Sequence, residues 1–150
     1  MARRIIDGNR YMTIATTASD GRPWATPVYF SPDAYRKLYW ISSPEAQHSV
    51  HIAQRPDVFV VVFDSQVPIG GAEAVYMRAR AQEVHEPTDE QCAVAFRPRF
   101  EGVKVFEPAE LRPPAKLRLY CATATEHWVL IRGNDPVWGR GIDARIPVSL

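Results

Sequence analysis

Cysteine is scarce in this sequence. Of the 150 residues only Cys92 and Cys121 are cysteines, and neither belongs to a Cys-x-x-Cys pair or has a histidine close by in the chain. This pattern does not indicate a zinc site or a redox-active pair. We therefore expect two reduced cysteines, one in a helix and one in a strand, in the core of a cytoplasmic protein.

An excess of charge of one sign is also missing. The 18 lysines and arginines are balanced by 17 acidic residues. Nothing in this balance would recruit nucleic acid or an anionic membrane by charge alone. The first eight residues include Arg3 and Arg4 but no apolar stretch that is long enough for a signal peptide or a membrane span. We expect neither nucleic acid nor a membrane as a partner.

The sequence lacks the motifs of hydrolytic and metal-dependent enzymes. It has no serine elbow flanked by glycines, no paired carboxylates at a familiar spacing, no His-x-x-x-His pair and no glycine-rich phosphate loop. The triplet Glu126-His127-Trp128 has no nucleophile nearby and is interpreted as part of a hairpin. We predict no catalytic side chain and no metal ligand, a pattern that suits a protein whose bound cofactor carries the reaction.

The residues that are present favour β structure. Tyr11–Thr17 and Trp24–Phe30 are rich in β-formers and flank the turn sequence Ser19-Asp20-Gly21-Arg22, which predicts a hairpin. Pro27 has no N–H to donate to a ladder. The second strand is therefore expected at a sheet edge, at a bulge, or with its backbone facing a ligand.

Further elements follow at short spacing. We predict a strand at 37–41, a strand at 58–63 that is an apolar run buried on both faces, and an alternating strand with outward arginines at 74–83. A helix capped by Thr88 is predicted at 89–97. Residues 117–123 and 127–131 are predicted to form a last hairpin that turns at Thr125-Glu126. Residues 100–114 are expected to be irregular and 133–150 to form a surface arm. Six or seven strands with two or three short helices predict one mainly β domain spanning residues 1–150, a closed or partly open barrel.

The segment Ser42–Ser49 interrupts the strands with a predicted helix start. Ser43 is a plausible N-cap, and Pro44 suits the first helical position. The free N–H groups of such a turn and the helix dipole would face an anion such as phosphate. An ordinary cap that binds nothing is the alternative. Ala46, Val50 and Ala53 are predicted to form the inward stripe of this helix.

Three stretches carry a resemblance to a known family. The first stretch comprises residues 13–16 and 20–23, the second residues 38–43 and the third residues 74–77. The resemblance lies in their order and spacing. Together they resemble the pyridoxamine 5′-phosphate oxidase-like family of flavin-binding split β-barrels. The resemblance implies an antiparallel split barrel that forms a homodimer, with FMN or the deazaflavin F420 in a groove between the subunits.

The resemblance also implies the binding residues. The hydroxyl that would hold the flavin phosphate falls on Ser42, and the basic pair of the family falls on Gln47 and His48, within the helix start that also contains Ser43 and Ser49. Backbone groups of Val28 and Tyr29 would face the flavin ring, and Val75 and Tyr76 would approach the flavin of the partner.

The sequence departs from the family at the phosphate. Gln47 replaces an arginine, and Phe30 or Ser31 stands where the oxidases have a lysine, so two fixed positive charges are missing. A charged hydrogen bond to phosphate contributes about 1.5–3 kcal/mol, against about 1 kcal/mol for a neutral one. His51, one turn after His48, is expected at the surface.

Two functions therefore remain open. The first is an oxidoreductase that uses FMN or F420 on a small substrate. The second is a non-catalytic carrier or sensor of flavin or haem, or a structural dimer whose groove is empty.

Overall fold

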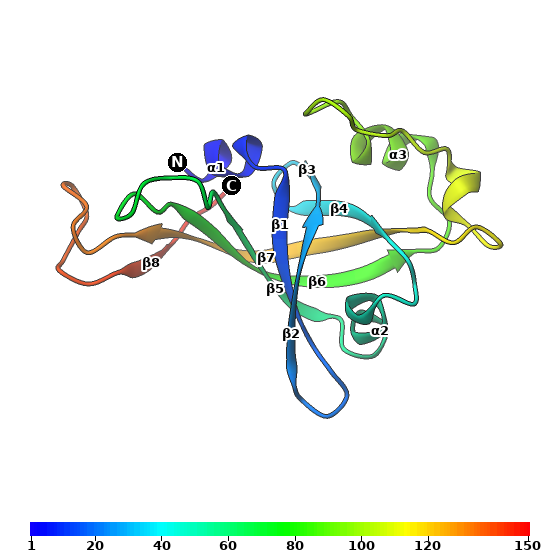
Figure 1. Cartoon of the computed structure of the whole chain (residues 1–150), viewed down its shortest axis with the longest axis horizontal. Coiled ribbons are helices and arrows are strands. Elements are labelled where there is room, and N and C mark those ends of the chain that lie inside the picture. The colour runs from blue at the N-terminus through cyan, green and yellow to red at the C-terminus, as the bar shows by residue number, and fades with distance from the viewer.

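One strongly curled antiparallel sheet organises the computed structural model, which describes all 150 residues (Figure 1). Its strands are β1 (Tyr11–Thr17), β2 (Pro23–Tyr29), β3 (Ser31–Asp33), β4 (Lys37–Ser42), β5 (Asp57–Phe63), β6 (Ala74–Val84), β7 (Arg118–Ile131) and β8 (Ala144–Pro147). Seven strands follow the order β2-β1-β5-β6-β7-β4-β3, and β8 pairs with β7. The predicted split-barrel class is confirmed.

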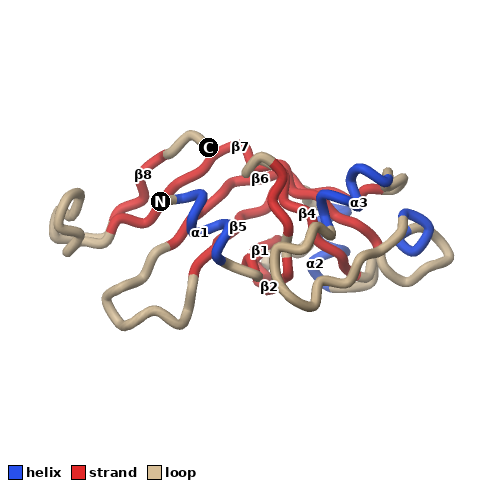
Figure 2. The backbone as a smooth tube through the Cα atoms, turned by 90° about the horizontal axis from the view of Figure 1, so that it is seen from above, coloured by secondary structure: helices blue, strands red, loops and turns tan.

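The helices lie around this sheet. They are α1 (Ala2–Gly8), α2 (Gln47–Gln54), α3 (Asp89–Ala95) and the 3-10 turn η1 (Pro108–Leu111). Figures 1 and 2 show α2 and α3 near β4, whereas β8 and both chain ends lie toward the opposite end of the molecule. None of the helices combines the length and the hydropathy that a membrane crossing needs.

Two hydrophobic cores share β4 as a wall. The larger core includes Ile14, Val60 and Met77 from the inner face of the sheet, and it also contains Leu38 and Trp40 of β4. The smaller core contains Tyr39 of the same strand and lies beneath α3. Successive strand residues point to opposite faces. For this reason β4 contributes side chains to both cores.

Several predictions are confirmed in detail. The first hairpin pairs β1 with β2, and β2, which contains Pro27, is an edge strand with no second neighbour. α3 begins at the predicted capping box, where the Gln91 N–H donates to Thr88 Oγ1 at 3.2 Å and the Thr88 N–H donates to Gln91 Oε1 at 3.0 Å. Both cysteines are free and buried, and burial raises the pKa of each thiol.

The predicted last hairpin is wrong. Residues 118–131 form one continuous strand, β7, and no turn occurs at Thr125-Glu126. Arg78 pairs with Glu126 and Ala79 with Ala124, so Thr125 is the extra residue of a β-bulge. Its hydroxyl donates to the carbonyl of Arg78 at 3.2 Å. The dipeptide contains no glycine, asparagine or proline that would favour a tight turn.

The prediction that β5 is buried on both faces is half wrong. Val58, Val60 and Val62 are buried, whereas Phe59 and Val61 on the other face are only partly covered and Phe63 is 47% exposed. β5 nonetheless lies between β1 and β6 within the sheet. A central strand therefore presents an apolar outer face to solvent in the single chain.

Candidate functional site

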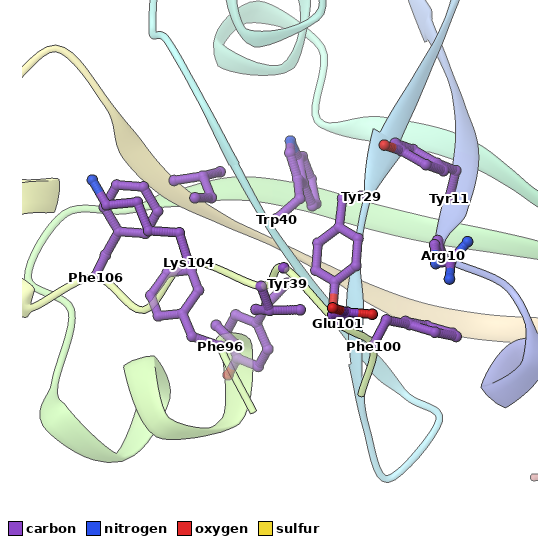
Figure 3. Close-up of a pocket in the computed structure, with 14 residues that line it drawn as sticks. Arg10, Tyr11, Tyr29, Tyr39, Trp40, Phe96, Phe100, Glu101, Lys104 and Phe106 are labelled. Carbon is purple, nitrogen blue, oxygen red and sulfur yellow. The ribbon is translucent and has the colours of Figure 1, made fainter. Parts of the chain in front are cut away.

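An aromatic cleft lies where edge strand β2 approaches β4. Its volume is about 300 Å³, and ten of its 14 lining residues are hydrophobic. Tyr29, Tyr39 and Trp40 line it from the strands, and the segment after α3 closes the other side (Figure 3). The remaining lining residues are Arg10, Tyr11, Ile41, Ala95, Phe96, Phe100, Glu101, Gly102, Val103, Lys104 and Phe106. We call this cavity the aromatic cleft.

Arg99 ties the closing segment to the sheet. Its guanidinium donates to the carbonyl of Phe30 at 2.7 Å and to that of Ile6 at 2.8 Å. Burial lowers the pKa of this guanidinium. The guanidinium also lies 5.1 Å from the ring centroid of Phe30 and 5.2 Å from that of Phe100. The wall formed by Phe100 is therefore anchored to both α1 and the end of β2.

Two of the residues that line the aromatic cleft carry a polar atom without a protein partner. The Tyr29 hydroxyl and the Trp40 indole N–H are buried and make no hydrogen bond. Such groups are rare in folded proteins, since each one has lost its hydrogen bonds to water. Burial raises the pKa of the neighbouring Tyr39 to about 12, so this phenol is neutral. The Trp40 indole nitrogen points away from the other cleft residues in Figure 3, so the aromatic cleft offers apolar walls and one free donor, the Tyr29 hydroxyl.

Cations stand at the two ends of the aromatic cleft. Arg10 and Lys104 lie at opposite ends in Figure 3. Arg10 is 5.0 Å from the ring centroid of Phe100, and Lys104 is 4.3 Å from that of Phe106. A flat ring carrying a negative group would find aromatic faces in the middle and a positive charge at either end.

The predicted start of α2 is wrong by several residues. The helix begins at Gln47 with Ala46 as N-cap, and no side chain caps its first turn. Ser43 instead forms a turn, in which its hydroxyl accepts from the Glu45 N–H at 3.1 Å. The predicted inward stripe is wrong as well, because Val50 and Ala53 are exposed and His48, Ser49, His51 and Ile52 are buried.

Ser42 and His48 do come together, as a closed pair. Ser42 Oγ and His48 Nε2 are 2.9 Å apart, and His48 is only 7% exposed. Burial, followed by the proximity of His51, lowers the pKa of His48. This imidazole is therefore neutral at neutral pH. The two predicted phosphate contacts are satisfied by each other.

Gln47 makes a second, partly buried contact. Gln47 Nε2 lies 2.7 Å from His51 Nε2, and His51 Nδ1 lies 3.0 Å from Thr16 Oγ1. An amide nitrogen only donates, so His51 Nε2 accepts and the ring proton resides on Nδ1. The expectation that His51 lies at the surface is wrong, because the bonds to Thr16 and Gln47 satisfy both of its ring nitrogens.

The other predicted residues lie in three places. Tyr29 lines the aromatic cleft, whereas the side chains of Val28 and Val75 are buried in the larger core. Only the backbone of these valines could contact a ligand. Ser49 faces a different cavity, between α2 and β6. Tyr76 lies on the outer face of the sheet, 6.4 Å from Phe59 between ring centroids.

Sequence reasoning missed one wall of the aromatic cleft. Phe96 is the C-cap of α3, and Phe100 and Phe106 belong to the irregular segment after it. A signal was present, because three aromatic residues within eleven positions of a proline-containing segment need a surface to cover. No periodicity connects these residues to β2 or β4, so their meeting place was not predictable from pattern alone.

Comparison with known proteins gives a family match. A sequence model of the pyridoxamine 5′-phosphate oxidase family matches residues 2–128. Among curated proteins the chain has no match.

Solved structures share the fold at low sequence identity. The haem storage protein HutZ from Vibrio cholerae is 15% identical over 93% of this chain and 94% of its own, with a TM-score of 0.68. A haem-binding protein from Mycobacterium smegmatis is 17% identical over 97% of this chain and 55% of its own, with a TM-score of 0.66. An F420 reductase is 20% identical over 84% of this chain and 94% of its own, with a TM-score of 0.60.

Proposed function

Because the chain belongs to the pyridoxamine 5′-phosphate oxidase family, we propose that it binds a flavin-type cofactor, FMN or the deazaflavin F420, as an oxidoreductase acting on a small molecule. One observation carries this proposal. The aromatic cleft between β2 and β4 combines apolar walls with one unpartnered donor, Tyr29 Oη. Small-molecule sites commonly consist of an apolar cavity with a few converging polar groups.

The residues of the aromatic cleft fit the ring of such a cofactor. Rings from the sheet side and from the segment after α3 face one another across it (Figure 3). A flat heterocycle gains stacking contacts there, and one of its carbonyl or ring-nitrogen acceptors would satisfy the free donor of Tyr29. A bound flavin would supply hydride or electron transfer. The chain itself would orient the ring and exclude water.

The hydrogen bonds that join the first turn of α2 to β4 and within α2 do not suit the binding of a phosphate dianion. Ser42 is bonded to His48 and Gln47 to His51, and burial keeps His48 neutral. Lysine and arginine are absent from this set. A phosphate here would have to break two partly buried bonds without gaining a fixed charge. An anionic cofactor tail must therefore find its partners elsewhere.

The proposal includes a homodimer, with the outer face of β5, β6 and β7 as the contact. We use "outer face" for Phe59, Val61, Phe63, Tyr76 and Trp128. The Phe59 and Trp128 rings stack with centroids 6.2 Å apart, and these apolar side chains remain partly or largely exposed in the single chain. A second copy packed on the outer face would bury them. Tyr76 could then reach the partner.

A second function is favoured by the neutral contacts at α2. The two positive charges that the family has at the phosphate are missing from this chain. If catalysis has been lost with them, the protein would be a non-catalytic carrier or sensor of flavin or haem, or a structural dimer with a degenerate cofactor groove. Haem-binding proteins occur among the structures that share the fold. In the aromatic cleft no histidine or cysteine is present to ligate a haem iron.

Spectroscopy of the purified protein separates these functions. FMN, F420 and haem have different absorption bands, and each can be added in turn while the midpoint of thermal unfolding is followed. We expect FMN or F420 to raise the midpoint and to be reduced when a nicotinamide nucleotide is supplied. A bound flavin that is never reduced would favour the carrier. If all three ligands leave the midpoint unchanged, the proposed function is wrong.

A further inference from the structure

We infer that residues 97–106 form a movable lid over the aromatic cleft and that Arg99 is the latch that holds this lid closed. We call residues 97–106 the lid. Six of the residues that line the aromatic cleft belong to it: Phe100, Glu101, Gly102, Val103, Lys104 and Phe106. The inference rests on the proposed function only in taking the aromatic cleft as the ligand site.

The backbone of the lid belongs to no regular element. No helix or strand lies between Phe96, the C-cap of α3, and Glu107, the N-cap of η1. No backbone–backbone hydrogen bond involves residues 100–106. Gly102 gives the lid a turn with a φ of +84°, and a Cβ added there would meet no other atom within 4 Å. Segments with few backbone hydrogen bonds open at a small part of the free energy of global unfolding. The lid can therefore move while the sheet stays folded.

Arg99 fastens the lid to two other parts of the chain. The last four carbonyls of an α-helix have no partner within the helix, and those of Ile6 and Asp7 are among them in α1. Arg99 Nη2 donates to these carbonyls at 2.8 and 3.2 Å, and Nη1 donates to the carbonyl of Phe30 at 2.7 Å. A cation is also favourable at the C-terminal end of a helix dipole. One side chain of the lid thus binds both α1 and the end of β2.

The same side chain holds a wall of the aromatic cleft. Phe100 follows Arg99 in the chain and lines the cleft. Its ring centroid lies 5.2 Å from the Arg99 guanidinium and 5.0 Å from that of Arg10, so two cations contact this ring. Loss of Arg99 would release the lid from α1 and β2, and it would remove one of the two cations that position Phe100.

The far end of the lid stays attached without Arg99. Phe106 is buried in the smaller core, where its ring centroid lies 5.3 Å from that of Phe96. Leu111 of η1 is fully buried in the same core. The lid should therefore open from its Phe100 end, which lies near the Tyr29 hydroxyl in Figure 3, and pivot at Phe106.

The latch should lengthen the time for which a ring stays in the aromatic cleft. Such a ring would contact Phe100 only while the lid is closed, and opening of the lid would precede its dissociation. Arg99 does not itself line the cleft. It acts on the ligand through Phe100 and is a positioning residue.

Limited digestion of the ligand-free protein with trypsin tests the lid. Cleavage after Lys104 requires the lid to leave its closed position, so its rate follows the population of the open state. Arg99→Gln should speed this cleavage about tenfold, because charged hydrogen bonds are lost. Arg99→Lys keeps the charge without the paired N–H groups and should lie between Arg99→Gln and the wild type. Cleavage after Arg118 in β7, followed by mass spectrometry, should keep its wild-type rate.

Arg55→Gln is the matched control. Arg55 also donates to a backbone carbonyl, that of Ser19 at 2.8 Å, but it is the C-cap of α2 and does not line the cleft. This variant should be cut after Lys104 at the wild-type rate. The lid is overturned if R99Q is cut there no faster than R55Q, or if R99Q is cut equally faster after Lys104 and Arg118. The second result would show that Arg99 stabilises only the fold as a whole. No flavin is present, so the result does not depend on the proposed function.

Stopped-flow fluorescence with FMN then tests the latch. For R99Q we expect a dissociation rate about tenfold higher than that of the wild type, with an association rate that is not lower, because the wall opens more easily. A damaged cleft would instead slow association and leave dissociation unchanged. That result, or any unchanged dissociation rate, contradicts the latch. If the wild type does not bind FMN, the proposed function fails, and the digestion still decides whether the lid moves.

Discussion

The hydrogen bonds of single polar atoms show which residues are already paired within the protein and which could still bind a ligand. Ser42 and His48 bond to each other, and His51 bonds at both ring nitrogens. The hydroxyl of Tyr29 is buried and makes no hydrogen bond. Because a buried donor loses its hydrogen bonds to water when the chain folds, an unpartnered one marks a place where a ligand gains most.

Replacing Tyr29 with phenylalanine should affect folding and binding in opposite directions. The hydroxyl makes no protein bond, so Tyr29→Phe should leave the free energy of unfolding unchanged or raise it. The same change should weaken FMN or F420 about threefold to tenfold by removing one donor. Urea unfolding and fluorescence titration measure the two quantities. Tyr11→Phe is the control, because Tyr11 lines the same cleft but is 59% exposed.

His48 should make stability depend on pH. Burial lowers its pKa below the ordinary value of 6.5, so the unfolded chain takes up the proton first as the pH falls. The stabilisation is complete above pH 6.5 and is lost as the pH falls from there through the lower pKa of the folded state. In urea unfolding, His48→Gln should lose less stability than the wild type below that pH. The exposed His85, changed to Gln, should behave like the wild type.

At the scale of elements, α3 holds one wall of the aromatic cleft in place. The helix is capped at Thr88, and it carries Ala95 and Phe96 to the cleft. Thr88→Ala should lower the free energy of unfolding by about 1 kcal/mol, because one first-turn N–H loses its partner. Thr88→Ser keeps the acceptor and should stay close to the wild type in the same urea titration. Equal losses in both variants would show that the cap bond is unimportant.

Elements with a local signal were predictable from the sequence. The turn at Asp20-Gly21, the capping box at Thr88 and the alternation along β6 each depend on a few neighbouring residues, and the structure confirms them. Elements that depend on distant partners were not. The straight course of β7 through Thr125-Glu126 requires the bulge against Arg78 in β6, which lies far away in the sequence.

The candidate site was predictable only in part, for the same reason. The resemblance named Tyr29, Ser42 and His48 as cofactor contacts; the structure places Tyr29 at a cleft and Ser42 beside His48, and their role toward a cofactor stays a prediction. It could not show that His51 would bind Gln47 and Thr16, because Thr16 comes from β1. Hydrophobic pattern failed at α2, where histidine and serine face inward. Paired polar groups can be buried at little cost, and their pairing is not visible in a local pattern.

At the scale of the whole molecule, the outer face is the feature that a single chain does not explain. β5 lies in the middle of the sheet, yet its residues Phe59 and Val61 are only partly covered and Phe63 is exposed. Arg78 lies 5.7 Å from the Trp128 ring centroid and Arg145 4.5 Å from that of Tyr76, so cations border the aromatic side chains. An apolar centre with a charged rim is typical of a protein–protein contact.

The homodimer can be tested at Val61. A carboxylate at the centre of an apolar contact is buried without a partner, so Val61→Asp should convert the dimer to a monomer in sedimentation or light scattering. Val105→Asp is the matched control, because Val105 is 63% exposed and lies outside the outer face, and this variant should stay dimeric. Far-ultraviolet circular dichroism should be the same for both. A wild-type protein that is already a monomer at micromolar concentration would contradict the dimer, and a cofactor groove shared by two subunits could not then form.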